Sequence, residues 1–251
     1  MKNPEIIYES KDILVVNKPA GLLVHGTDNI KLETQKYSGS KFQVLSLVDW
    51  LVKKYPEIKN VGDEPEMRPG IVHRLDKDTS GAMIIAKNQA AFEHLKKQFS
   101  ERKIKKTYLA LVAGKIKEKV GAINLAIGRS RKNPTLRAAS PKARGKLREA
   151  ITEYKVLEKF TPSDGVNFTL VEAYPKTGRT HQLRVHFKAI GHPVACDKIY
   201  GNKANCLSGL SRLFLHAYSL ELTLPDGSRG RFEADLPADL KRVLRELRKE
   251  K

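Results

Sequence analysis

The chain has 251 residues, enough for one large domain or two small ones with a substantial core. Lysine and arginine number 47 against 28 acidic residues, and the resulting charge of +19 favours a polyanionic partner such as RNA. No stretch approaches the roughly 20 apolar residues of a bilayer span, and no apolar signal segment follows the N-terminus. We therefore expect a soluble, cytoplasmic protein without a membrane partner.

The first predicted elements are a buried strand at residues 12–16 and a turn at residues 17–21, where proline and glycine fix the backbone. Polar sequence at residues 26–43 forms an insertion without an assigned role. Apolar residues at helical spacing then predict an amphipathic helix over residues 45–55, and residues 56–70 are expected to form a loop.

Residues 71–87 are expected to form a strand at residues 71–75, a polar turn at residues 76–81 and a second strand at residues 82–86, and a helix should follow at residues 89–102. Further β-rich runs, separated by glycine, proline or charge, lie at residues 107–112, 122–127, 151–157, 168–174 and 213–224. Helices are predicted at residues 180–190 and at the C-terminus, where four apolar residues share one face: Leu240, Val243, Leu244 and Leu247.

The order of these elements predicts an α+β fold in which helices surround a mixed, mainly antiparallel sheet. No internal repeat and no convincing linker divide the chain, so we expect a single domain over residues 1–251. Cys196 and Cys206 are too few for a disulfide framework, and no other Cys/His pair has zinc spacing. We expect both to be free thiols.

Residues 128–148 contain eight basic residues and no acidic one. Such a run is typical of a solvated loop as well as of an RNA-binding segment. Anionic membrane binding would require an amphipathic segment with bulky apolar anchors, which the chain lacks.

Residues 73–81, with the sequence His-Arg-Leu-Asp-Lys-Asp-Thr-Ser-Gly, form a polar turn between two apolar runs. The pattern alone fits an Asx-type turn without any function. An aspartyl phosphatase would also use Asp76 and Asp78, but Ser80 stands where that site needs threonine or valine. A metal site is disfavoured because His181 and His186 are five residues apart, one step beyond the i, i+4 placement.

Four motifs, taken in order, resemble the RluA family of pseudouridine synthases. They are Asn-Lys-Pro-Ala-Gly at residues 17–21, the polar turn at residues 73–81, Lys-Thr-Tyr-Leu-Ala-Leu-Val at residues 106–112, and Gly-Arg-Thr-His-Gln-Leu-Arg-Val-His at residues 178–186. The resemblance extends from about Glu9 to Asp235.

The resemblance implies that Asp76 is the catalytic carboxylate. It also implies that Arg74, Tyr108 and Arg184 bind the substrate, with Arg74 close to the flipped-out nucleotide. Lys77 departs from the family, because arginine is common at that position. On a helix over residues 180–190, Arg184 would share one face with His181, a candidate RNA contact, and would supply the counter-charge of Asp76.

An enzyme of this family isomerises uridine to pseudouridine without a redox change or phosphate transfer, so we expect neither cofactor nor metal. The implied partner is RNA, with ribosomal RNA favoured and transfer RNA possible, and the implied state is a monomer. Many relatives carry an extra N-terminal RNA-binding domain. We expect no separate one here, so that residues 128–148 become the candidate for gripping RNA. A non-enzymatic RNA-binding protein on the same fold remains the alternative.

Overall fold

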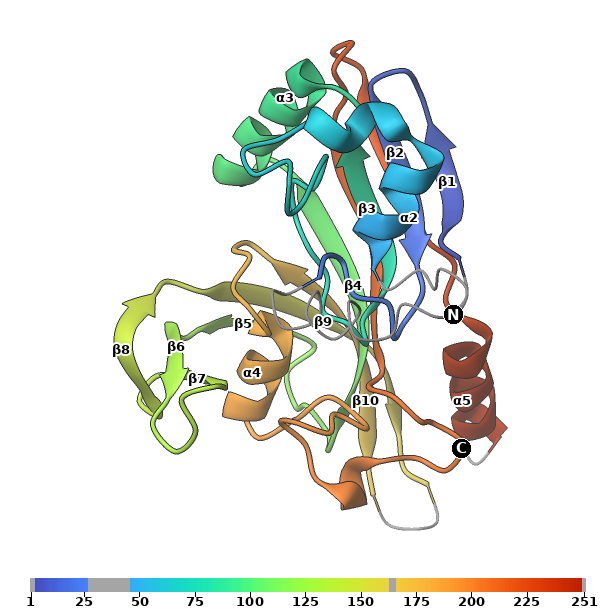
Figure 1. Cartoon of the computed structure of the whole chain (residues 1–251). Helices are drawn as coiled ribbons and strands as arrows, with labels where there is room; N and C mark the ends of the chain where they lie inside the picture. The colour runs from blue at the N-terminus through green and yellow to red at the C-terminus, as the bar shows by residue number, and fades with distance from the viewer. Residues whose placement is uncertain (1–2, 27–45, 163–165, 250–251) are drawn as a thin grey trace, which may run out of the picture. The chain divides into compact units, whose positions relative to one another are not determined.

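The protein is described by a computed structural model covering residues 3–26, 46–162 and 166–249 (Figure 1). The chain divides into two compact units, one formed by residues 1–104 and 220–234 and the other by residues 105–219 and 235–251. The expectation of a single domain stays a prediction. The expected insertion at residues 26–43 lies, apart from Gly26, outside the described residues.

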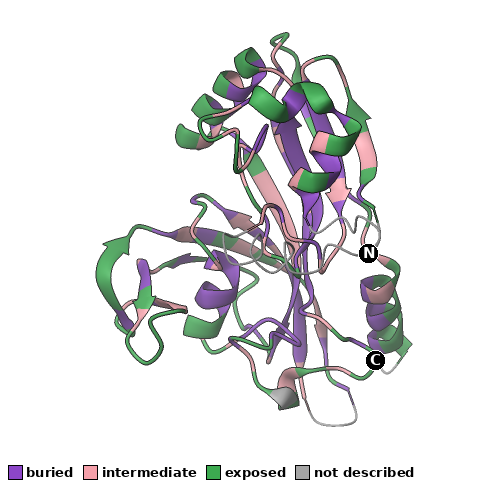
Figure 2. Ribbon diagram, viewed as in Figure 1, coloured by how far each residue is buried: buried purple, intermediate pink, exposed green. Residues whose placement is uncertain are grey.

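The first unit is built on strands β1 (Glu5–Glu9), β2 (Ile13–Lys18) and β3 (Ser80–Ala86), joined by the C-terminal end of β11 (Leu215–Thr223) and by β12 (Arg229–Glu233). β1 pairs antiparallel with β2, and β2 pairs antiparallel with β3. All seven residues of β3 are buried, as expected for a strand with both faces covered, and Figure 2 shows this strand in purple.

Helices α2 (Leu47–Lys54) and α3 (Gln89–Ser100) belong to the same unit, with the short 3-10 helix η1 (Pro56–Asn60) between them in the chain. Each α-helix begins at a polar cap. Ser46 Oγ accepts a hydrogen bond from Asp49 N, and Asn88 Oδ1 accepts one from Ala91 N, which satisfies backbone donors that the first turn leaves without partners. Both helices confirm the sequence predictions to within a few residues.

The predicted strand at residues 71–75 is wrong. Only Ile71 forms an isolated bridge, with Ile85, and the chain then bends away. The imidazole of His73 takes over a backbone role there, since its Nε2 accepts a hydrogen bond from Ile84 N of β3 at 3.1 Å. The ring of His73 also stacks on Phe99 of α3 at 4.7 Å, which holds the segment as a loop against the unit.

The second unit contains strands β4 (Lys105–Ala113), β5 (Val120–Asn124), β9 (Ile151–Phe160) and β10 (Phe168–Pro175), in the order β4-β10-β9-β5. These neighbours pair antiparallel, as do β1, β2 and β3 of the first unit. The described strands and helices therefore confirm the predicted α+β fold with a mainly antiparallel sheet.

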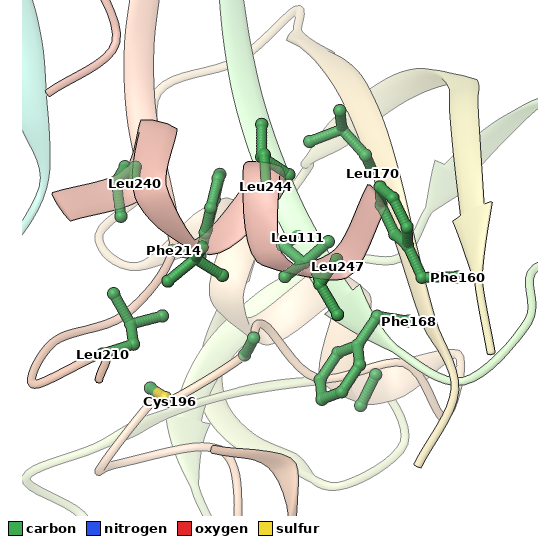
Figure 3. Close-up of a cluster of buried hydrophobic side chains, with 13 residues drawn as sticks. Leu111, Phe160, Phe168, Leu170, Cys196, Leu210, Phe214, Leu240, Leu244 and Leu247 are labelled. Carbon is green, nitrogen blue, oxygen red and sulfur yellow. The ribbon is translucent and has the colours of Figure 1, made fainter. Parts of the chain in front are cut away.

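Alternate residues of β4 face two different helices. Leu111 and Ala113 belong to a cluster with α5 (Ala238–Lys249), whereas Ala110 and Val112 belong to a cluster with α4 (Gln182–Ala189). Figure 3 shows Leu240, Leu244 and Leu247 of α5 gathered over Leu111 and Phe214. The predicted apolar face of the last helix is confirmed, because its four apolar residues are all buried.

The basic segment forms a small antiparallel sheet in the order β7-β6-β8, which the sequence did not predict. Its strands are β6 (Ile127–Ser130), β7 (Arg137–Ala139) and β8 (Ala143–Arg148). Ile127 and Ala139 are buried, while β8 is exposed along most of its length and is largely green in Figure 2.

The expectation of free thiols is also wrong, because Cys196 and Cys206 form a disulfide. The turns between them, including the 3-10 helix η2 (Lys203–Asn205), bring two cysteines that are ten positions apart together. Within the described part of the chain, no helix is long and apolar enough to cross a bilayer.

Candidate active-site residues

Asp76 lies on the loop that leads into β3. The side chain of Leu75 is buried and anchors the loop, Asp76 itself is half-buried, and Lys77 and Asp78 are exposed. Thr79 N donates a hydrogen bond to Asp76 O at 3.1 Å, which closes a turn around the carboxylate-bearing residue. The loop therefore presents Asp76 at the boundary between interior and solvent, where its side chain can meet a substrate.

A fully buried lysine joins this loop to the turn that follows β2. Lys18 Nζ donates to Lys77 O at 3.0 Å, to Leu22 O at 2.8 Å and to Pro19 O at 3.0 Å. Gly21 N donates to the same Lys77 oxygen at 2.9 Å. Two motifs that lie almost sixty residues apart are thus one structural unit, and the ammonium group of Lys18 is its centre.

The neighbouring Arg74 is exposed, and its Nη1 lies 3.1 Å from His25 Nε2. His25 Nδ1 lies 3.0 Å from Gly26 O, which only accepts hydrogen bonds, so the neutral tautomer with its proton on Nδ1 satisfies both contacts. Arg74 and Asp76 are two residues apart on one loop, and both belong to the first unit.

Tyr108 lies in the second unit, on β4, and is half-buried. Its ring packs against the cluster that contains Ala110 and Val112 of the same strand and Leu183 of α4. Lys106, two residues earlier on the same face of β4, is also half-buried, and burial lowers its pKa to about 8. Sequence reasoning did not single out Lys106.

Arg184 lies on α4, and both the arginine and its partner Asp197 are buried. Arg184 Nε donates to Asp197 Oδ2 at 2.7 Å, and Nη2 donates to Oδ1 at 2.8 Å, which makes a bidentate pair. Burial alone would raise the pKa of Asp197, but the hydrogen bonds and charge of Arg184, together with the N–H groups of Ile199 and Tyr200, outweigh it and lower that pKa.

Leu183, Phe187 and Ile190 pack in one cluster and give α4 an apolar face. Asp197 was missed by sequence reasoning, because an acidic residue that follows Cys196 carries no local sign that it will be buried. The pairing of Arg184 with Asp76 stays a prediction, since the two residues belong to different units.

Tyr200 lies beside this pair, with the Arg184 guanidinium 5.0 Å from its ring centre. Its hydroxyl oxygen accepts from Arg137 N at 3.1 Å and lies within hydrogen-bond distance of His181 Nδ1, at 2.8 Å. Ile127, Ala139, Val185 and Tyr200 form one apolar cluster. The basic three-stranded sheet is therefore packed onto the helix that carries Arg184.

Three arginines form a row across the small sheet, because Arg129 lies opposite Arg137 on one side and opposite Arg144 on the other. No acidic side chain forms an ion pair with any of these three in the described structure. Like charges directly opposite each other destabilise a sheet, so the row is suited to an anionic partner. No group of three or more potential metal ligands occurs among the described residues.

Known proteins resemble the chain over most of its length. The profile of the family described as RNA pseudouridylate synthase matches residues 12–189. The chain is 37% identical over 232 residues to the ribosomal large subunit pseudouridine synthase D of Borreliella burgdorferi, covering 92% of this chain and 65% of that protein. It is 38% identical over 247 residues to an uncharacterized RNA pseudouridine synthase of Bacillus subtilis, covering 98% and 73%.

Among solved structures, human RNA pseudouridylate synthase domain containing 1 matches with a TM-score of 0.70 and 29% identity, covering 98% of this chain and 95% of that one. The chain spans 65% of the length of several curated relatives that it matches. On the extent of these matches, the chain belongs to the RNA pseudouridylate synthase family.

Proposed function

We propose that the protein isomerises specific uridines of a structured RNA to pseudouridine, with Asp76 as the catalytic carboxylate. The observation that carries the proposal is the family match across residues 12–189, which includes the loop that holds Asp76 at the surface of the first unit. The rigid attachment of this loop through Lys18 suits a group whose position must be fixed before the substrate binds.

The reaction breaks the bond from ribose C1′ to uracil N1, rotates the base and joins C1′ to C5, after which C5 loses its hydrogen as a proton and N1 takes up a proton. Asp76 either attacks C1′ or removes a neighbouring proton, and both routes need an ionised carboxylate. Arg184 supplies the positive counter-charge, and the ring of Tyr108 stacks on the uracil. Stacking offsets part of the few kcal/mol that it costs to flip a base out of its stack.

Arg74 contacts the backbone of the flipped nucleotide, because it is exposed two residues before Asp76 and carries a permanent charge. The arginine row of the small sheet grips phosphates away from the reacting base. Ribosomal RNA is the favoured substrate, since three of the relatives are named as ribosomal large subunit pseudouridine synthases, and transfer RNA is the alternative. We further propose that the protein acts as a cytoplasmic monomer.

The test is tritium release from RNA labelled at uracil C5, because formation of the new carbon bond expels that hydrogen. We expect release by the wild-type protein, loss of release in Asp76→Asn, and nearly unchanged RNA binding in that variant. Asp78→Asn is the matched control, since Asp78 is an exposed carboxylate on the same loop, and it should retain activity.

Substantial release by Asp76→Asn would overturn the assignment of the carboxylate. If the wild-type protein binds unmodified ribosomal and transfer RNA but releases no tritium from either, the protein is instead a non-enzymatic RNA-binding member of the family.

A further inference from the structure

We infer that Asp197 is a positioning residue, which holds the guanidinium of Arg184 in one orientation for the reaction. The inference concerns the second unit alone, where both residues lie, and it rests on the proposed function only for its effect on turnover. Three observations support it. The Asp197 carboxylate accepts hydrogen bonds from its own loop as well as from Arg184, the loop is held by a disulfide and a close backbone contact, and the Arg184 guanidinium is held by Asp197 and Tyr200.

The Asp197 carboxylate accepts four hydrogen bonds from two directions. Arg184 supplies two of them, and Ile199 N and Tyr200 N donate to Oδ1 at 2.9 Å and 3.0 Å. The backbone donors fix the carboxylate on its own loop, so that it cannot follow Arg184 if the arginine moves. A carboxylate held in this way dictates where its partner lies.

The loop around Asp197 is tightly built. Gly201 N donates to Asp197 O at 2.8 Å, and a Cβ at position 201 would lie only 2.7 Å from that oxygen, so only glycine fits there. The residue before Asp197 is Cys196, whose disulfide with Cys206 closes the loop. Asp197 therefore stands at the fixed base of a covalently closed turn.

Arg184 is constrained at one edge and on one face. Asp197 holds the edge that carries Nε and Nη2, and the Tyr200 ring lies 5.0 Å from the guanidinium carbon. A guanidinium has five N–H donors in a rigid plane, so fixing one edge fixes the direction of the other. Stability gives a poor explanation for this arrangement, because a buried ion pair is often no more stabilising than apolar residues of the same volume.

The same unit provides a matched control. Arg212 Nε donates to Asp239 Oδ2 at 2.8 Å, but the Asp239 side chain is 38% exposed, and the pair involves α5 rather than α4. Asp197→Asn and Asp239→Asn each replace a carboxylate that pairs with an arginine by an amide of the same shape. Only the first should affect the orientation of Arg184.

The first measurement is independent of activity. In ¹⁵N-labelled protein, the Arg184 Nε–H should give a slowly exchanging resonance that is absent in Arg184→Lys. That resonance should be lost in Asp197→Asn and retained in Asp239→Asn. If Asp197→Asn keeps the resonance, or if no such resonance exists in the wild-type protein, Asp197 does not hold Arg184 and the inference is wrong.

The second measurement is a double-mutant cycle on turnover. A misplaced group in an active site costs about 100-fold in rate, so Asp197→Asn should lower kcat by about that factor, with little change in KM. In the Arg184→Lys background the same substitution should have almost no further effect, because Asp197 acts through Arg184. Asp197→Glu, which restores the charge at a shifted position, should recover part of the rate.

An equal loss of kcat in both backgrounds would show that Asp197 has only a general structural role. If Asp197→Asn does not fold, Asp197→Glu replaces it in the same double-mutant cycle. Asp197→Glu should then lower kcat in the wild-type background but not in the Arg184→Lys background. If the wild-type protein shows no turnover at all, the proposed function fails, while the Nε–H resonance still decides whether Asp197 positions Arg184.

Discussion

Replacing Arg129, Arg137 and Arg144 by glutamine removes the row of positive charge that crosses the three-stranded sheet. Glutamine keeps much of the length of each side chain and its ability to form hydrogen bonds, so the apolar cluster beneath the sheet should be undisturbed. The variant should fold as well as the wild-type protein or slightly better, because the substitution relieves repulsion between like charges. Its RNA affinity should fall, and the loss should depend on salt.

The size of the effect follows from counterion release. Each phosphate contact contributes about 0.7 to 0.9 to the slope of log Kd against log salt concentration, so three contacts contribute about 2 to 3. Between about 50 mM and about 200 mM salt, the advantage of the wild-type protein over the variant should therefore shrink by roughly 20- to 40-fold. The measurement is a fluorescence titration of a labelled RNA hairpin across this range.

The control carries the same loss of charge on another surface of the second unit. Arg242, Arg245 and Lys249 are exposed on α5, and their replacement by glutamine removes three positive charges as well. If both triple variants change the slope equally, the effect is one of net charge, and the arginine row is not a contact. A wild-type slope in the row variant would likewise refute the reasoning.

Three further predictions concern the scaffold. Lys18→Met leaves buried carbonyl oxygens without their donor and should lower the free energy of unfolding by about 1–3 kcal/mol in urea, whereas the exposed Lys77→Met should not; equal effects would contradict this. Alkylation of the denatured protein should label Cys196 and Cys206 only after reduction, and labelling without reductant would show free thiols. Reduction of this disulfide should lower the free energy of unfolding by about 3 kcal/mol. Burial lowers the pKa of His186 below 6.5, so the unfolded chain takes up this proton first and stability falls as the pH drops below 6.5. His186→Gln should remove that part of the pH dependence in thermal unfolding, and an unchanged dependence would count against a neutral buried His186.

Strong periodicity made most of the fold predictable from the sequence. The apolar face of α5 and the fully buried strand β3 follow from patterns that burial alone imposes. The small basic sheet was not predicted, because its exposed strand β8 lacks the alternation of apolar and polar residues that indicates a strand. Only a few residues of the sheet, such as Ile127 and Ala139, are buried. At residues 71–75 the error was the opposite one, because an apolar run predicted a strand where the structure has a loop. His73 attaches this loop to β3.

The residues of the candidate site also fall into a group that the sequence could identify and a group that it could not. Asp76, Tyr108 and Arg184 could be identified from the sequence because each lies in a motif that resembles those of a known family. The roles of Lys18 and Asp197 could not, because they depend on contacts with distant segments of the chain. A lysine in a turn motif and an aspartate after a cysteine carry no local sign that they will be buried. Tertiary structure alone assigns them their partners.

The attachment of the basic sheet to α4 shows how the proposed phosphate contacts and the proposed active-site residue Arg184 can act together. Three short strands with a charged outer surface bury too little to be stable alone, so the sheet depends on the cluster that joins Ile127 and Ala139 to Val185 and Tyr200. The Tyr200 hydroxyl bonds both Arg137 N of the sheet and His181 at the start of α4. The proposed RNA contact and Arg184 are thus fixed to one support before binding. RNA held by the arginine row would then need little further ordering of the protein, and a grip without base-specific contacts could still set the distance from the bound phosphates to Arg184.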